Sequence, residues 1–351
     1  MRTALFLLLF LTTPTIAADR PTVVVVIGAE GAPEYASEFG KWADRWIAAG
    51  NSGGARVVVI GRGQTSAETA SRPMEDRDRL RAAIEAEVGV APATQPTSAP
   101  ATAPITRPAT LPISTAPLWI VLIGHGTYDS REAKFNLRGP DLSDQELAEW
   151  LRPARRPLAV INCSSASAPF LNRLSGPDRI VVVATRSGTE IQFSRFGDYL
   201  SRSIADTSAD LDKDGQTSLL EAYVAASHQT DAFYKEAGRL ATEHALLDDT
   251  GDALGTPATW FQGTRATKSA KTGAATDGHR AHQWHLVPSA AEQAIPPDIR
   301  ARRDALELQI QAIRDRKTTL SEADYYAQLD SLLLDLAQVY AAAEKQASTR
   351  P

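Results

Sequence analysis

Residues 118–126 read LWIVLIGHG, and residues 158–167 read LAVINCSSAS. Each begins with a hydrophobic run typical of a strand that is buried on both faces of a parallel sheet. Each run is followed by a residue whose side chain can take part in catalysis, the imidazole of His125 in the first case and the thiol of Cys163 in the second. Because the carboxyl ends of parallel strands meet at one edge of a sheet, we expect both side chains to reach the same crevice if the strands are neighbours.

Three further runs of this kind predict additional strands, at 22–27 (TVVVVI), 56–60 (RVVVI) and 179–184 (RIVVVA). Segments with apolar residues at helical spacing lie between the strands, at 34–49, 76–88, 143–151 and around 170–174. Strands that alternate with helices predict an α/β fold, in which a mostly parallel sheet is sandwiched by helices.

The composition is that of a globular protein. The chain has 351 residues, of which 43% are hydrophobic and 23% charged, and its formal net charge is −5. This acidic balance argues against nucleic acid as a partner. The single cysteine excludes an intrachain disulfide framework.

The first 18 residues have the features of a signal peptide. A short positive segment precedes the apolar run 4–11, and small residues follow at 15–18. This order is typical of a cleavable export signal, and the apolar run is short for a permanent anchor. We therefore expect an exported protein, periplasmic or secreted, with no membrane association after signal cleavage.

The remaining chain divides by composition. Residues 19–262 are expected to form the α/β domain, with a disordered Pro/Thr/Ala-rich insertion at 91–117. Residues 263–296 are expected to be a linker, and 297–347 a C-terminal helical hairpin. The hairpin carries an apolar stripe, which we expect to be covered by another surface. That surface is either the cleft region of the α/β domain or a second copy of the chain. Monomer and homodimer both remain open.

His125 and Cys163 together suggest nucleophilic catalysis. A thiol needs a neighbouring base to become a thiolate near neutral pH, and imidazole is the usual base. The backbone amides of Gly126 and Cys163 could then hydrogen-bond a developing oxyanion. The alternative is that Gly-His-Gly is a turn and that Cys163 is a core residue.

The two strands and their endings resemble the caspase and legumain group of cysteine peptidases. The sequence CSSAS (163–167) resembles the legumain-type Cys-x-Ser-x-Ser, and VVVATRSGTE (181–190) is similar to the strand and substrate-binding segment that follows in those enzymes. The resemblance covers residues 22–260 in the order of elements, and closely only 118–200. Asn162 departs from it, because legumains carry a small residue there. The resemblance implies a caspase-like fold with His125 as general base, Cys163 as nucleophile and the Gly126 and Cys163 amides as oxyanion hole. It also implies that the substrate meets Arg186, Glu190 and Arg195.

Residues 210–221 (DLDKDGQTSLLE) match the calcium-loop pattern D-x-D-x-D-G-x5-E at every defined position. Calcium takes six to eight oxygen ligands, which the alternating side chains of such an EF-hand-like loop direct inward. The exit helix is expected to start within the loop. The predicted ligands of Ca²⁺ are Asp210, Asp212, Asp214, Gln216 (through its carbonyl), Ser218 (through water) and Glu221 (bidentate). The alternative interpretation is an Asp-rich surface turn.

A run of three histidines, His279, His282 and His285, invites a zinc interpretation. Its spacing suits neither one face of a strand nor one face of a helix beyond the first pair, so we favour a solvated or packing role.

The sequence thus predicts a calcium-stabilised cysteine endopeptidase that acts on a peptide or protein substrate through a Cys/His dyad. A catalytically inactive calcium-binding interaction module on the same fold is the main alternative. An acyl or peptidyl transferase that uses the same dyad is a third possibility.

Overall fold

The computed structural model describes residues 19–62, 74–89, 114–271 and 274–347. The predicted signal peptide and most of the predicted insertion lie outside the described residues. Among those that are described, no helix has the length and hydrophobicity needed to cross a membrane.

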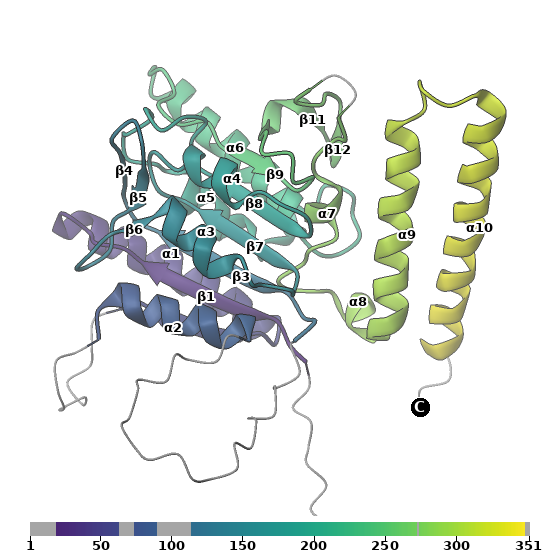
Figure 1. Cartoon of the computed structure of the whole chain (residues 1–351), viewed down its shortest axis with the longest axis horizontal. Coiled ribbons are helices and arrows are strands. Elements are labelled where there is room, and N and C mark those ends of the chain that lie inside the picture. Colours follow the sequence, from purple (N-terminus) through teal and green to yellow (C-terminus); the bar gives the residue numbers. More distant parts are fainter. Residues whose placement is uncertain (1–18, 63–73, 90–113, 272–273, 348–351) are drawn as a thin grey trace, which may run out of the picture.

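A seven-stranded sheet with the order β10-β9-β8-β7-β3-β1-β2 forms the centre of the molecule (Figure 1). Its five longest strands, from β8 to the edge strand β2, run parallel to one another. At the other edge, β9 pairs with β8 in the antiparallel direction. The strands are β1 (Thr22–Ile27), β2 (Arg56–Ile60), β3 (Leu118–Ile123), β7 (Leu158–Asn162), β8 (Arg179–Val183), β9 (Leu246–Asp248) and β10 (Thr256–Pro257). Every residue of β1 and β3 is buried, as expected for strands covered on both faces.

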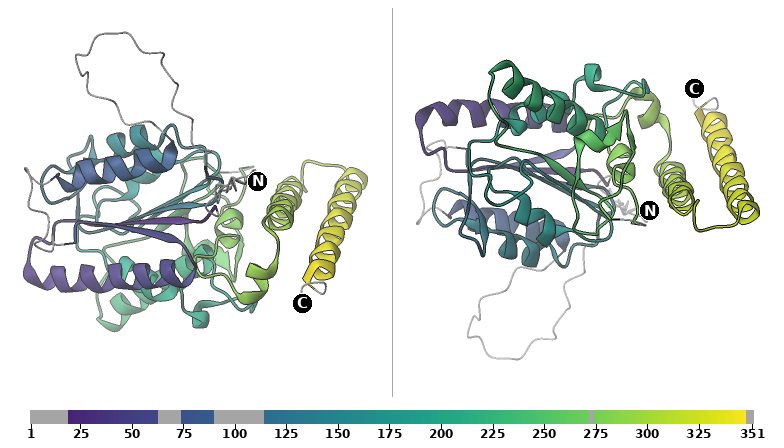
Figure 2. Two further views of the ribbon diagram at one scale, coloured as in Figure 1. Left: turned by 90° about the horizontal axis from the view of Figure 1, so that it is seen from below. Right: turned by 90° about the horizontal axis from the view of Figure 1, so that it is seen from above.

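Helices cover both faces of this sheet, which confirms the predicted fold class (Figure 2). One face packs on α1 (Pro33–Ser52), α5 (Phe196–Ser203) and α6 (Leu219–Glu236). The other face packs on α2 (Asp76–Val88), α3 (Asp144–Leu151) and α4 (Ala168–Leu174). Alternate strand residues supply the two cores, because successive side chains of a strand point to opposite faces.

Shorter elements complete the domain. They are the strands β4 (Gly126–Tyr128), β5 (Ala133–Phe135), β6 (Leu142–Ser143), β11 (Phe261–Gln262) and β12 (Arg265–Ala266), the 3-10 turns Thr207–Ala209 and Ala258–Trp260, and the helices α7 (His279–His282) and α8 (Ala290–Ala294). Strands β4, β5 and β6 form a small antiparallel sheet at the carboxyl edge of the main sheet.

The predicted linker, residues 263–296, differs from that expectation because much of it packs on the α/β domain. Ala281, Trp284 and Leu286 join the core beneath α1, α5 and α6. The indole of Trp284 lies 5.2 Å from that of Trp119 in β3. The linker prediction rested on the Thr/Ala/Gly/Lys-rich stretch 264–278, whereas the apolar residues that join the core come after it.

Buried carboxylates fix the same segment to the domain. Asp277 accepts hydrogen bonds from the Asp249 and Thr250 amides through Oδ1 and from the Thr256 hydroxyl through Oδ2. Asp249 accepts hydrogen bonds in return from the Gly278 and Ala281 amides. Burial, and after it the negative charge of Asp249, raises the pKa of Asp277 to about 8.

We expect the Asp277→Asn variant to be more stable than the wild type at pH 8 and similar to it near pH 4. A carboxyl whose pKa is raised in the folded state holds a proton that the unfolded chain has lost, so the free energy of unfolding falls as pH rises from about 4 to about 8. Asparagine cannot ionise. Its Oδ1 can accept the Asp249 and Thr250 amides, and its Nδ2 can donate to the Thr256 hydroxyl oxygen, which reverses that hydrogen bond. Urea unfolding at several pH values measures the two slopes, and equal slopes between pH 4 and 8 would contradict the raised pKa.

The C-terminal hairpin consists of α9 (Pro297–Asp315) and α10 (Glu322–Ala347). It touches the domain through α9. The Gln283 side chain donates to the Asp304 carbonyl and to Glu307, and the Thr276 amide donates to Asp315. The hairpin lies on the side of the domain away from β4, β5 and β6 (Figure 1), so it does not cover the carboxyl ends of the strands. Tyr326, Leu333, Leu334 and Tyr340 of α10 are exposed.

Candidate functional site

The two strands that carry the predicted dyad are neighbours. Strands β3 and β7 pair in parallel, with Leu122 opposite Asn162. His125 and Cys163 therefore follow adjacent strand ends, as the sequence predicts. The Cys163 amide donates to the Leu122 carbonyl at 2.9 Å and continues the ladder by one residue.

The Cys163 side chain points into the apolar core. It is 1% exposed and belongs to the cluster that also contains Trp42 of α1 and Phe196 of α5. A Cβ atom on Gly197 would lie 2.7 Å from the Cys163 Cβ, so α5 approaches the cysteine closely. Burial, with a smaller contribution from the charge of Glu243, raises the pKa of the thiol to about 12. These surroundings disfavour a thiolate.

The His125 imidazole lies among aromatic rings. Its centroid is 4.7 Å from that of Tyr35, 5.2 Å from Phe39 and 5.9 Å from Phe193. Nε2 lies 3.2 Å from the Glu30 carbonyl oxygen, which can only accept, so this hydrogen bond places a proton on Nε2. Among the described residues, His125 and Cys163 share no hydrogen bond.

The two amides expected to bind an oxyanion already donate hydrogen bonds to other groups of the protein. The Cys163 amide belongs to the sheet ladder, and the Gly126 amide donates to the Ser165 hydroxyl at 3.2 Å. The same hydroxyl donates to the Gly126 carbonyl. A Cβ atom on Gly126 would lie 2.2 Å from the Ser165 carbonyl oxygen, so close packing alone requires glycine here.

The loop after β7 is held by its own polar side chains. Asn162 Oδ1 accepts hydrogen bonds from the Ser164 amide at 3.0 Å and from the Ser164 hydroxyl at 2.7 Å. Asn162, Ser164 and Ser165 are all buried. The departure from the legumain pattern at Asn162 therefore builds a closed hydrogen-bonded turn.

The three predicted substrate-binding residues separate into two groups. Glu190 forms an ion pair with Arg186 at 3.2 Å and a contact with His244 Nδ1 at 2.6 Å. Arg195 lies elsewhere. Its guanidinium carbon is 4.3 Å from the ring centre of Phe233 and 5.6 Å from that of Phe193, an arrangement typical of cation–π contacts.

Arg195 lines a cleft of about 320 Å³ beside His125. Tyr35 and Phe193 contribute to both the cleft and the aromatic surroundings of the imidazole. Two of the acidic side chains in the wall are paired, Glu38 with Lys41 and Asp198 with Arg45. The wall includes Tyr35, Glu38, Phe193, Arg195, Phe233 and Arg239.

Glu243 organises this wall, although no sequence motif singles it out. Its buried carboxylate accepts hydrogen bonds from the Ser194 hydroxyl, the Arg195 and Phe196 amides and the Tyr234 hydroxyl. Three of the four donors come from residues 194–196, which lead into α5, and the fourth comes from the end of α6. Their convergence on one carboxylate depends on tertiary structure, so no local sequence pattern predicts it.

The predicted calcium loop has the backbone that such loops require. Asp210 accepts from the Lys213 and Gly215 amides, Asp212 from the Asp214 amide and Asp214 from the Gln216 amide. Lys213 and Gly215 adopt positive φ angles of 67° and 88°. The exit helix α6 begins within the loop, where Ser218 and Glu221 form a capping box. A 3-10 turn (207–209) precedes the loop in place of an entering helix.

The donor set of this loop fits calcium. Carboxylate oxygens of Asp210, Asp212 and Asp214 lie within 4.8 Å of one another. Glu221 is buried at the end of the loop, and its Oε1 accepts the Leu211 amide. Hard oxygen donors of this kind are the ligands that calcium prefers.

No protein-family model matches the sequence, and a comparison with curated proteins also finds no match. Solved structures similar to this chain include two insect caspases. The initiator caspase Dronc from Drosophila is 12% identical, with a TM-score of 0.41, 66% of this chain covered and 80% of that one. Caspase-1 from Spodoptera frugiperda is 8% identical, with a TM-score of 0.35, 66% of this chain covered and 86% of that one. Similarities this distant carry no argument about the chemistry of the site.

Proposed function

We propose that this protein is a calcium-stabilised binding module on a caspase-like α/β fold, acting outside the cytoplasm. The observation that carries the proposal is the state of Cys163, whose thiol is 1% exposed, has a pKa of about 12 and has no hydrogen bond to His125. A nucleophilic cysteine needs an accessible thiolate and a base within reach. The geometry therefore favours the binding module over the two functions that need a reactive thiol, the peptidase and the transferase.

The cleft beside His125 is the binding surface in this proposal. Its aromatic rings offer apolar contact area, and Arg195 offers a cation whose position is fixed by Phe193 and Phe233. In the part of the chain that the structure describes, the Arg195 guanidinium lies against rings, whereas its backbone amide donates to Glu243. A peptide segment with an acidic side chain has the matching chemistry.

The cysteine peptidase is the second candidate, because β3 and β7 are adjacent and place His125 and Cys163 at neighbouring strand ends. It requires a conformation in which the thiol leaves the core and meets the imidazole. Peptide-library binding and cleavage, measured with wild type, Cys163→Ala and Arg195→Gln, tests the two functions. Turnover that is lost in Cys163→Ala establishes the peptidase, whereas binding that is lost only in Arg195→Gln supports the module.

We expect Cys163 of the native protein to react very slowly with iodoacetamide at pH 8. A thiol with a pKa of about 12 is only about one part in 10⁴ ionised at this pH, about a thousandfold less than an unperturbed cysteine. Mass spectrometry of samples taken with time, with urea-unfolded protein as the control, measures the two rates. Equal rates in the native and the unfolded protein would contradict the buried thiol and return the dyad to consideration.

A further inference from the structure

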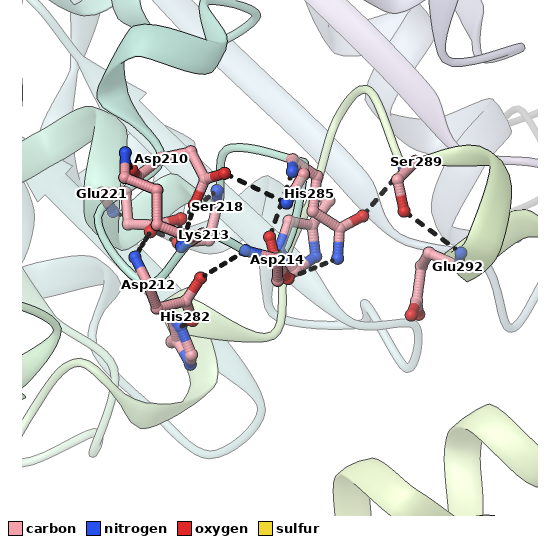
Figure 3. A network of polar contacts seen from close by, with 12 residues as sticks. Asp210, Asp212, Lys213, Asp214, Ser218, Glu221, His282, His285, Ser289 and Glu292 are labelled. Carbon is pink, nitrogen blue, oxygen red and sulfur yellow. Dashed lines mark hydrogen bonds and ion pairs between the residues drawn. The ribbon is translucent and has the colours of Figure 1, made fainter.

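Two residues of the histidine run face the calcium loop (Figure 3). His282 Nε2 lies 2.8 Å from Asp212 Oδ2, and His285 Nε2 lies 4.0 Å from Asp214 Oδ2. These contacts join residues that are far apart in the sequence. The histidine run is thus part of the loop's surroundings rather than a solvated tract.

Backbone contacts hold this segment against the loop. The Leu219 amide donates to the Trp284 carbonyl at 2.8 Å, and Ser218 and His285 form an antiparallel β-bridge. The Ser289 amide donates to the Gln216 side-chain carbonyl at 2.9 Å. Before His282, the Gly278 and Ala281 amides donate to Asp249. The segment that places His282 beside Asp212 is therefore held on both sides of this histidine.

The contacts create two overlapping sets of donor atoms. Asp210, Asp212 and Asp214 form a set of oxygens only, and Asp212, Glu221 and His282 form a set of two carboxylates and one imidazole. In each set the donor atoms lie within 4.8 Å of one another. Oxygen donors suit calcium, whereas imidazole combined with carboxylate is typical of zinc and similar transition metals.

We propose that Asp212, Glu221 and His282 form a second metal site that takes a divalent transition metal such as zinc. Because Asp212 belongs to both sets, and Glu221 is also a predicted calcium ligand, zinc and calcium compete for the loop. The zinc site stands on its own contacts, and only the competition rests on the proposed calcium site. The segment 279–285, which carries the histidines, thereby adds a nitrogen ligand to the loop and extends the range of metals that the loop binds.

Calorimetric titration of the metal-free full-length protein with Zn²⁺ and, separately, with Ca²⁺ tests the proposal. We expect His282→Ala to weaken zinc binding at least tenfold and to change calcium binding by less than about twofold. Asp214→Asn belongs to the oxygen-only set, so it should weaken calcium binding and leave zinc binding unchanged. Calcium added in excess should lower the apparent zinc affinity of the wild type.

The matched control is His228→Ala, because His228 is an exposed histidine on α6. It should bind both metals as the wild type does, and the melting temperature of each metal-free variant checks its folding. Zinc binding by His282→Ala that equals that of the wild type and of His228→Ala would overturn the second site and leave His282 a hydrogen-bond partner of Asp212. If none of the proteins, the wild type included, binds calcium, and His282→Ala still weakens zinc binding, only the calcium proposal is refuted.

Discussion

Replacing Trp284 by alanine is expected to lower the free energy of unfolding by about 3 to 5 kcal/mol, the usual cost of truncating a large buried aromatic side chain. Trp284 is 9% exposed, and its ring packs on Trp119 near the start of β3. Its carbonyl also accepts the hydrogen bond from Leu219 at the start of α6. Urea unfolding followed by far-UV circular dichroism measures the change.

Trp260→Ala is the matched control, because Trp260 is partly exposed and its truncation leaves a smaller cavity. We expect it to cost clearly less than Trp284→Ala. A loss below about 1 kcal/mol for Trp284→Ala would mean that residues 263–296 behave as the linker that their composition suggests, and that their packing contributes little to stability.

The parallel sheet was predictable because its strands have no plausible alternative. Runs such as TVVVVI at 22–27 are short, β-branched and apolar throughout, and only a strand covered on both faces buries all of their side chains. The antiparallel strands β9 and β10 lack this signal, since they have three and two residues. Their place at the sheet edge depends on pairing, of β9 with β8 and of β10 with β9, and not on their own sequence.

The candidate site was predictable in position but not in geometry. The sequence predicted that His125 and Cys163 follow the ends of two parallel strands, and the structure shows that these strands are neighbours. The direction of the thiol depends on which face of β7 the Cys163 side chain occupies. Ala159 and Ile161 face the core beneath α1, α5 and α6, and Cys163 continues this period of two into the same core. Counting faces along β7 would therefore have predicted a buried cysteine. The partners of His125 come from α1 and from the segment before α5, which no local pattern links to it.

The partners of His282 and His285 could not be predicted from the sequence for a different reason. The spacing of these histidines within the run argued against a shared face on one element, and on that ground we favoured a solvated or packing role. In the structure, the carboxylates they meet lie about 70 residues earlier in the chain. Local spacing carries no information about such partners.

Saturating calcium is expected to raise the melting temperature by about 5 to 10 °C. A ligand present at a hundredfold excess over its dissociation constant stabilises the folded state by about 2.7 kcal/mol, and each kcal/mol moves the melting temperature of a domain of this size by about 2 to 4 °C. The physical source is the group of three aspartates in the loop, whose like charges repel one another until a cation lies between them. Differential scanning calorimetry in calcium and in chelator measures the shift.

Asp214→Asn separates calcium binding from the folding of the loop. Its side-chain oxygen can still accept the hydrogen bond from the Gln216 amide, so the loop keeps its turn while it loses one charged ligand. We expect the variant to melt near the wild type in chelator and to gain much less from calcium. Magnesium is the control ion, because it demands a tighter octahedral site and gives up its water reluctantly, so it should produce only a small shift. If wild type and variant melt at one temperature in calcium and in chelator alike, the loop is an Asp-rich turn held by its own amide hydrogen bonds, and the stability of the domain owes nothing to a cation.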